Sequence, residues 1–183
     1  MKQLLILVFL CGTTVFSQNK KHFIKITFND GPLQGTHTFY PEKGNYMSQA
    51  NLELFEGASN VNASKLMTAD GFQIHYINRH FAGEASEGTH DTKKFTSGCG
   101  SLNFIDGNNS QPYKKIDGDF TGCSPTTITK VSAWKDGIVK KRRTVSGHFE
   151  DTIQLKIRND DGSEKTVETT VKVEFTVNES RRK

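Results

Sequence analysis

Apolar and polar residues alternate strictly along residues 166–177, near the end of the chain. Every second side chain is apolar or threonine, and the positions between carry threonine, lysine or glutamate. Because successive side chains of a β-strand point to opposite faces, this period of two predicts a half-buried strand. The positions predicted to face the core are Val167, Thr169, Val171, Val173, Phe175 and Val177.

A second alternating stretch covers residues 149–157, and its apolar side chains share one face with Asp151 as the odd member. The residues between the two stretches, 159–163, read Asn-Asp-Asp-Gly-Ser and tolerate turn geometry. The two stretches therefore predict a β-hairpin. Its first strand is predicted to bury Phe149, Ile153, Leu155 and Ile157.

Shorter segments predict further strands, and no segment has convincing amphipathic-helix spacing. Residues 45–56 and 60–69 are ambiguous, the former between a strand and a short helix. Short strands separated by turn residues predict an all-β fold, a single antiparallel β-sandwich or barrel. The other predicted strands cover residues 22–28, 36–40, 72–81, 101–105, 113–121 and 126–134, with turns at 29–32 and 135–137.

The first seventeen residues have the order of features of a cleaved signal peptide. Lys2 is their single charge, an apolar run covers residues 4–10, and small residues follow up to Ser17. The run is shorter than the roughly 20 residues that cross a bilayer. We therefore expect residues 1–17 to be removed and residues 18–183 to form one exported all-β domain. It would be periplasmic or extracellular, including the cell surface, with no integral membrane segment.

Cys99 and Cys123 remain once the predicted signal peptide is removed. Export into an oxidising compartment favours their pairing. The predicted strands at 101–105 and 113–121 flank a loop rich in turn residues, midway between the two cysteines. A hairpin centred on that loop brings both cysteines to its open end, so we predict a disulfide between them.

The most unusual local feature is the run Lys140-Lys141-Arg142-Arg143. On a strand, both of its faces are charged, so it cannot lie in the middle of a core. One interpretation is an edge strand or hairpin tip, where charge blocks pairing with other chains. The other is a contact for an acidic glycan or another surface polyanion, with Trp134 either stacking on a sugar or anchoring the core. The candidate contact comprises Lys140, Lys141, Arg142, Arg143 and Trp134.

Positive charge is concentrated in one place. The chain has a formal net charge of +4, and residues 135–143 alone carry five basic residues and one acidic residue, which also gives +4. A nucleic-acid-binding protein usually has a broader basic surface, so we expect no nucleic-acid partner.

Other candidate chemistry is weak. His75 and His80 are the closest pair of histidines, but a continuous strand places His80 on the face of Phe72 and Ile74 and His75 on the opposite face. The loop at 106–110 alternates oxygen-bearing side chains but lacks the downstream glutamate of a calcium loop. Motifs for a nucleophilic serine or a phosphate loop are absent from the sequence. We therefore predict no metal, no cofactor and no catalytic residue.

These observations favour an exported, non-catalytic binding or cell-surface domain. One alternative is a barrel that carries a small apolar ligand, which requires a large interior cavity. The other is a secreted hydrolase of unrecognised type, which requires titratable groups from distant strands to converge in a cleft. The binding domain requires neither feature.

Overall fold

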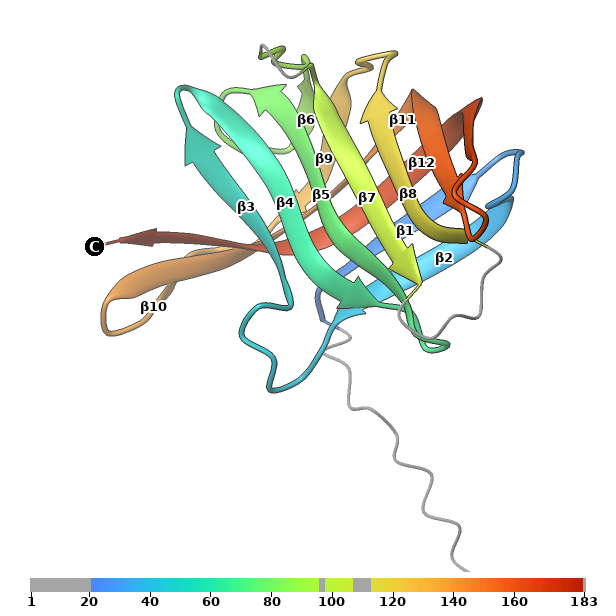
Figure 1. The fold of residues 1–183 in the computed structure, drawn as a ribbon. Helices are drawn as coiled ribbons and strands as arrows, with labels where there is room; N and C mark the ends of the chain where they lie inside the picture. Colours follow the sequence, from blue (N-terminus) through green and yellow to red (C-terminus); the bar gives the residue numbers. More distant parts are fainter. Residues whose placement is uncertain (1–20, 96–97, 107–112, 183) are drawn as a thin grey trace, which may run out of the picture.

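The computed structural model describes residues 21–95, 98–106 and 113–182, and this part of the chain is all-β. Its strands form one large sheet (Figure 1). The strands are β1 Phe23–Phe28, β2 Gly35–Pro41, β3 Gln49–Phe55, β4 Ala58–Met67, β5 Phe72–Ala82, β6 Gly88–His90, β7 Gly100–Asp106, β8 Tyr113–Phe120, β9 Thr126–Val131, β10 Lys135–Asp136, β11 Lys140–Asn159 and β12 Glu164–Arg182.

Two sequence predictions fall wholly or partly beyond these residues. The predicted signal peptide at 1–17 lies outside them, and so does most of the loop considered for calcium, because 107–112 are not described. Within the described ranges, no helix is long and apolar enough to cross a membrane.

The predicted C-terminal hairpin is confirmed. β11 and β12 pair in antiparallel fashion along their whole length, from Lys140 opposite Arg182 to Arg158 opposite Glu164. The predicted inward positions of β12 are buried from Thr169 to Val177, and the intervening positions are at least partly exposed. Alternation was a sufficient guide here because a slip of one residue would move every apolar side chain to the solvent face.

The outer edges of this hairpin recruit the remaining strands. β12 pairs with β1, and β11 pairs with β8. From β8 the pairing continues through β7, β5 and β4. β4 then meets β2 at two residue pairs, and β2 pairs with β1. In Figure 1, β3, β4, β5 and β7 lie in front of β1, β2 and β12.

The prediction of a purely antiparallel sheet is wrong at one point, which makes the sheet mixed. β12 pairs with β1 only as far as Thr176, and beyond it Asn178 and Glu179 pair in parallel with Asn51 and Leu52 of β3. β12 continues beyond the end of its pairing with β1, and β3 pairs with the edge of β12 that is left open there. The ambiguous segments at 45–56 and 60–69 thus contain β3 and most of β4. The predicted turn at 135–137 is also displaced, because Lys135 and Asp136 form the short strand β10.

β5 changes register once, which overturns the predicted distribution of its side chains. The register shifts between Ile74 and Tyr76, so that His75 is an extra residue in the strand. The extra residue reverses the alternation, and His80 does not share a face with Ile74. The buried side chains of β5 beyond the shift are Ile77, Arg79 and Phe81.

Aromatic rings fill one end of the interior. The ring centroids of Phe72 and Phe104 lie 5.1 Å apart, those of Phe39 and Phe104 5.6 Å apart, and those of Phe28 and Phe104 6.0 Å apart. All four side chains are buried. Contacts at these distances stabilise beyond the burial of area alone.

The other end of the interior holds a buried ion pair. Arg79 is 0% exposed, and its Nη1 donates to Oδ2 of Asp151 at 2.6 Å. The guanidinium lies 4.5 Å from the centroid of Phe149 and 5.4 Å from that of Phe120. Burial lowers the pKa of Arg79, and the charge of Asp151 and its hydrogen bond oppose that shift. The odd member of the β11 face is therefore the counter-ion of a buried arginine.

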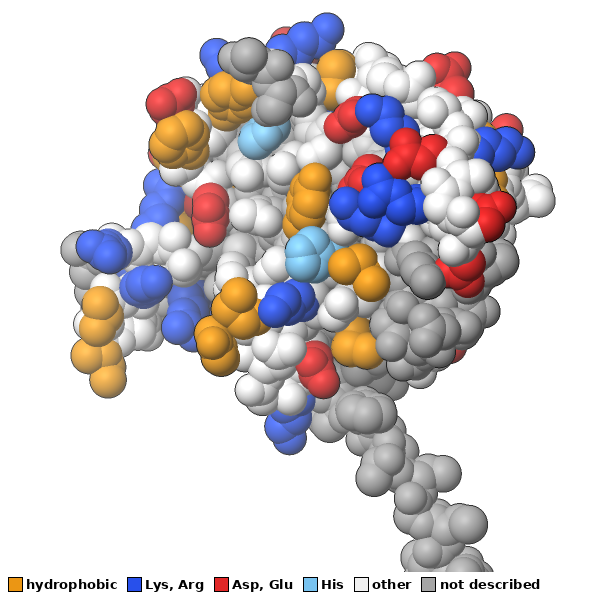
Figure 2. Space-filling view, in the orientation of Figure 1, with side chains coloured by type: hydrophobic (Ala, Val, Ile, Leu, Met, Phe, Trp, Pro, Cys, Tyr) orange, Lys and Arg blue, Asp and Glu red, His pale blue; other side chains and the backbone are white. Residues whose placement is uncertain are grey.

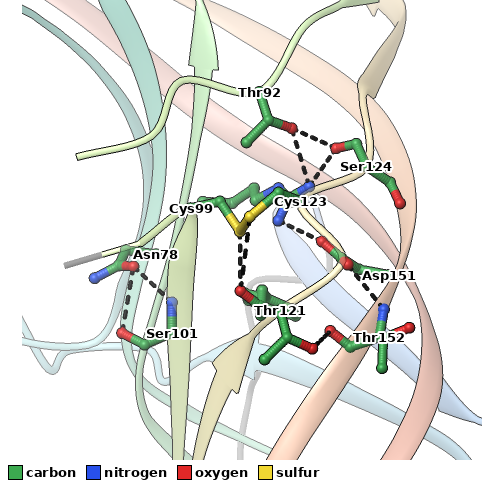
Figure 3. The surroundings of a disulfide bond; sticks show 11 residues. Asn78, Thr92, Cys99, Ser101, Thr121, Cys123, Ser124, Asp151 and Thr152 are labelled. Atoms are coloured by element: carbon green, nitrogen blue, oxygen red, sulfur yellow. Dashed lines mark hydrogen bonds and ion pairs between the residues drawn. A yellow bond between two sulfur atoms is a disulfide. The ribbon is translucent and has the colours of Figure 1, made fainter. Parts of the chain in front are cut away.

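Cys99 and Cys123 lie beside this pair at disulfide distance, with Cα atoms 5.6 Å apart (Figure 3). They stand at the open end of the β7–β8 hairpin, as predicted. Cys123 has a positive φ of 52°, and the carbonyl of the next residue, Ser124, accepts a hydrogen bond from Nη2 of Arg79. The disulfide thus holds in place an acceptor on which the buried arginine depends.

We expect Asp151→Ala to lower the free energy of unfolding by about 3–5 kcal/mol, because it leaves a buried charge without its partner. Replacing both partners, as in Arg79→Met with Asp151→Leu, should recover most of that loss. Glu150→Ala is the matched control, since its neighbouring carboxylate is exposed and lies 3.7 Å from Lys172, and should cost less than about 1 kcal/mol. Urea unfolding measures all three, and equal losses for the two single variants would contradict the account.

Candidate functional site

The basic run lies in an arm that extends from the body of the protein. We call residues 135–143 together with 180–182 the basic arm. It consists of β10, the turn after it, the start of β11 and the end of β12, which projects from the sheet in Figure 1. Lys135 pairs with Arg142 on one edge of β11, and Lys140 pairs with Arg182 on the other. Strands of both edges therefore hold the arm extended.

Arg143 anchors the base of the arm. It stands opposite Glu179, two residue pairs beyond the buried pair Val145 and Val177. Its Nε donates to Oε2 of Glu179 at 2.5 Å, and its Nη2 donates to the carbonyl of Ala85 at 2.9 Å. Since Glu179 is buried, its carboxylate requires these donors. The charge of Arg143 is therefore committed within the protein.

Arg181 shares the same carboxylate. Its Nε and Nη2 donate to Oε1 of Glu179 at 3.1 and 2.9 Å, and Nη2 also donates to Oε2 of Glu84 at 2.9 Å. The hydrogen bond to Glu84 raises the pKa of Arg181, and the same bond lowers the pKa of Glu84. Two arginines and two carboxylates thus compensate one another where the arm leaves the body.

Trp134 packs against this cluster. The guanidinium carbon of Arg143 lies 4.5 Å from the centroid of the indole ring, and that of Arg181 lies 5.1 Å from it. These distances allow cation–π attraction. Trp134 is half-buried and lies outside the hydrophobic core, so it is not the core anchor considered from the sequence. Its contacts with the two arginines place it at the base of the arm.

Lys140, Lys141 and Arg142 differ from Arg143 because they are exposed. Within the described part of the chain, none of the three forms an ion pair. They lie with exposed Lys135 on an arm whose remaining charges are Asp136, Arg182 and the anchored cluster. The structure therefore divides the predicted contact residues into an anchor, Arg143 with Trp134, and three cations available to a partner.

A groove of about 840 Å³ runs beside the arm. Its basic lining comes from Lys21, Lys135, Lys140, Arg142 and Arg143. Asp136, the apolar tip of the arm and the ring of His22 also line it, with Ser132, Gly137, Thr144 and Asn178. Burial and the charge of Lys21 lower the pKa of His22, whose Nε2 is buried and has no hydrogen-bond partner among the described residues. Five basic residues against one acidic residue make the groove basic.

Three of the side chains that a catalytic site could use bond backbone groups in this structure. Nε2 of His37 bonds the carbonyl of Leu33 at 2.9 Å, and Nε2 of His90 bonds that of Ser86 at 2.7 Å. Glu87 accepts from the backbone of Val131. Across the described ranges, no three His, Cys, Asp or Glu side chains are placed to hold a metal ion.

His80 has a different environment. It lines a hollow of about 190 Å³ with Phe55 and Phe95, and its ring centroid lies 4.8 Å from that of Phe95. Burial, and then the charge of Arg79, lowers the pKa of His80. His75 is exposed and lies outside this hollow. The structure does not bring the two histidines together.

The sequence placed Lys135 in the basic segment at 135–143 but left it out of the candidate contact. It gave no sign that Lys21 and Arg182 lie beside the run, because both are distant from it in sequence. Sequence reasoning also missed the apolar pair Ile138-Val139 between Gly137 and Lys140. Two aliphatic residues in a turn next to four cations were a usable signal. Comparisons of this chain with protein-family models, with curated proteins and with solved structures found no match.

We expect Arg143→Ala to lower the free energy of unfolding by about 2–3 kcal/mol, because it removes charge-assisted hydrogen bonds to a buried carboxylate. Arg142→Ala removes the same charge from the next residue, which is exposed, and should change stability by less than about 0.5 kcal/mol. Thermal or urea unfolding of both variants tests whether Arg143 is an anchor and Arg142 is not. Equal effects would show that Arg143 is not an anchor.

Proposed function

We propose that this chain is an exported, non-catalytic binding domain that holds a surface polyanion, such as an acidic glycan, on its basic arm. One observation carries the proposal: Lys140, Lys141 and Arg142 are exposed and unpaired among the described residues, although carboxylates lie close enough to neutralise Arg143 and Arg181. Cations concentrated on one projecting element attract a polyanion and orient it before contact.

The groove supports the same function. Its exposed basic residues, Lys21, Lys135, Lys140 and Arg142, come from three separate segments of the chain. An extended anion that follows the groove meets several of them together, and multiple weak contacts add.

The form of the scaffold supports a binding role at the surface. We propose that the sheet is a closed barrel, because the pairings from β1 through β12, β11, β8, β7, β5, β4 and β2 return to β1. The Phe28–Phe39–Phe72–Phe104 cluster and the Arg79–Asp151 pair occupy its interior. Such a filled interior favours a partner outside the barrel over a small ligand within it.

Export remains part of the proposal. Two cysteines at disulfide distance suit an oxidising compartment, where such a bond persists. The pattern of residues 1–17 gives the route. Outside the cytoplasm, acidic glycans and other surface polyanions are accessible to the arm.

We expect Lys140→Ala, Lys141→Ala and Arg142→Ala together to move elution from a heparin column to clearly lower salt, because exposed cations dominate such retention. The triple change Lys43→Ala, Lys156→Ala and Lys165→Ala is the matched control. It removes the same charge from exposed positions outside the arm and should leave retention nearly unchanged. Equal loss in both variants would mean that retention follows net charge, and the site would be rejected.

A further inference from the structure

The tip of the basic arm is apolar and exposed. Ile138 is 99% exposed and Val139 is 67% exposed. They occupy the turn between β10 and β11, where polar residues and glycine are the usual choice. Isolated exposed apolar residues are common, but two adjacent aliphatic side chains at the end of a projecting element are positioned to contact something apolar.

Cations surround this tip. Lys135 and Asp136 precede the turn, Lys140 and Lys141 follow it, and Arg182 lies opposite Lys140 on β12. Figure 2 shows this region at the left of the molecule, where orange side chains lie at the lower end of the projection and blue side chains lie above and beside them. A flat partner that approaches the end of the arm would thus contact the aliphatic side chains at the tip and the cations around them.

We propose that the arm docks on an anionic lipid bilayer, with Ile138 and Val139 inserted at the headgroup boundary and the surrounding cations bound to lipid phosphates. The proposal rests on the proposed function and names the polyanion as an array of lipid headgroups. An anionic bilayer has negatively charged headgroups at the water boundary and an apolar layer beneath them. The arm has the matching order, with cations behind an aliphatic tip.

The chemistry of the tip selects this partner over a soluble acidic glycan. A sulfated or carboxylated glycan can satisfy Lys140, Lys141 and Arg142, but it offers little apolar surface to Ile138. The bilayer satisfies both groups in one orientation. The anchor of Arg143, Glu179 and Trp134 holds the arm extended before binding, so little order has to be gained on contact.

Flotation with vesicles tests the proposal. One set of vesicles is phosphatidylcholine alone, and the other contains about one third phosphatidylglycerol as the anionic lipid. The protein should partition at least tenfold more strongly onto the anionic vesicles. Ile138→Ser with Val139→Ser should weaken that partitioning about tenfold or more, and should leave retention on heparin unchanged. The Lys140, Lys141 and Arg142 triple variant should lose both.

A matched apolar control separates the tip from general surface hydrophobicity. Leu54 and Phe55, at the end of β3, are 43% and 63% exposed. Leu54→Ser with Phe55→Ser should change vesicle partitioning less than twofold. Both pairs are on the surface, so neither change should unfold the protein.

Each result assigns the failure to one proposal. If the Ile138 and Val139 variant binds anionic vesicles like the unaltered protein, insertion of the tip is overturned. If heparin retention depends on the three cations but the protein does not bind vesicles, the proposed function stands and the lipid partner is overturned. If vesicle binding needs the tip but heparin retention ignores the three cations, the general polyanion site fails instead. Conversion of a dimer into a monomer by the tip variant, seen by size-exclusion chromatography, would mean that a second copy covers the tip and would overturn docking.

Discussion

The ion pair between Arg79 and Asp151 is the constraint on which the body of the protein depends. Moving a guanidinium into the interior is costly, and the cost falls with each donor that finds an acceptor. Nη1 and Nη2 of Arg79 donate to acceptors from distant parts of the chain, namely Asp151 on β11, the carbonyl of Ser124 before β9 and the hydroxyl of Thr92 after β6. Nε of Arg79 is buried and has no hydrogen-bond partner among the described residues. A different register of any of these segments would strand the charge, so the pair favours one arrangement of the sheet over its alternatives.

The disulfide and two phenylalanines complete this centre. The link between Cys99 and Cys123 fixes the backbone next to Ser124, whose carbonyl accepts from Arg79. Phe120 and Phe149 enclose the guanidinium, and their rings meet edge to face at 5.3 Å. A covalent link, a charge pair and aromatic packing therefore secure the same junction of β5, β8 and β11. A scaffold fixed in this way can carry a long projecting arm without losing its own order.

Local patterns predicted the local features. The alternation of residues 166–177 and the turn at 159–163 were enough to define the β11–β12 hairpin. Once that turn is placed, the register follows, because Arg158 pairs with Glu164. Each preceding residue of β11 then pairs with the next residue of β12. Extended to the other end of the hairpin, this register places Arg143 opposite Glu179. The pairing of this arginine with a carboxylate could therefore have been predicted from the sequence.

Other features were beyond that kind of reasoning. The extra residue His75 reverses the faces of β5, so simple alternation placed Arg79 outside. Its partner lies 72 residues away, and no local pattern connects two such positions. The short strand β6 and the parallel contact of β3 with β12 also depend on packing between distant segments.

The body pairs the charges that it buries, whereas the arm leaves Lys140, Lys141 and Arg142 exposed and available. Hydrogen–deuterium exchange of the protein with and without a soluble polyanion such as dextran sulfate tests this division most directly. The account predicts slower exchange in the basic arm, at residues 135–143 and 180–182, with unchanged exchange in β3, β4 and β5. Slower exchange confined to those three strands, with the arm unaffected, would contradict it.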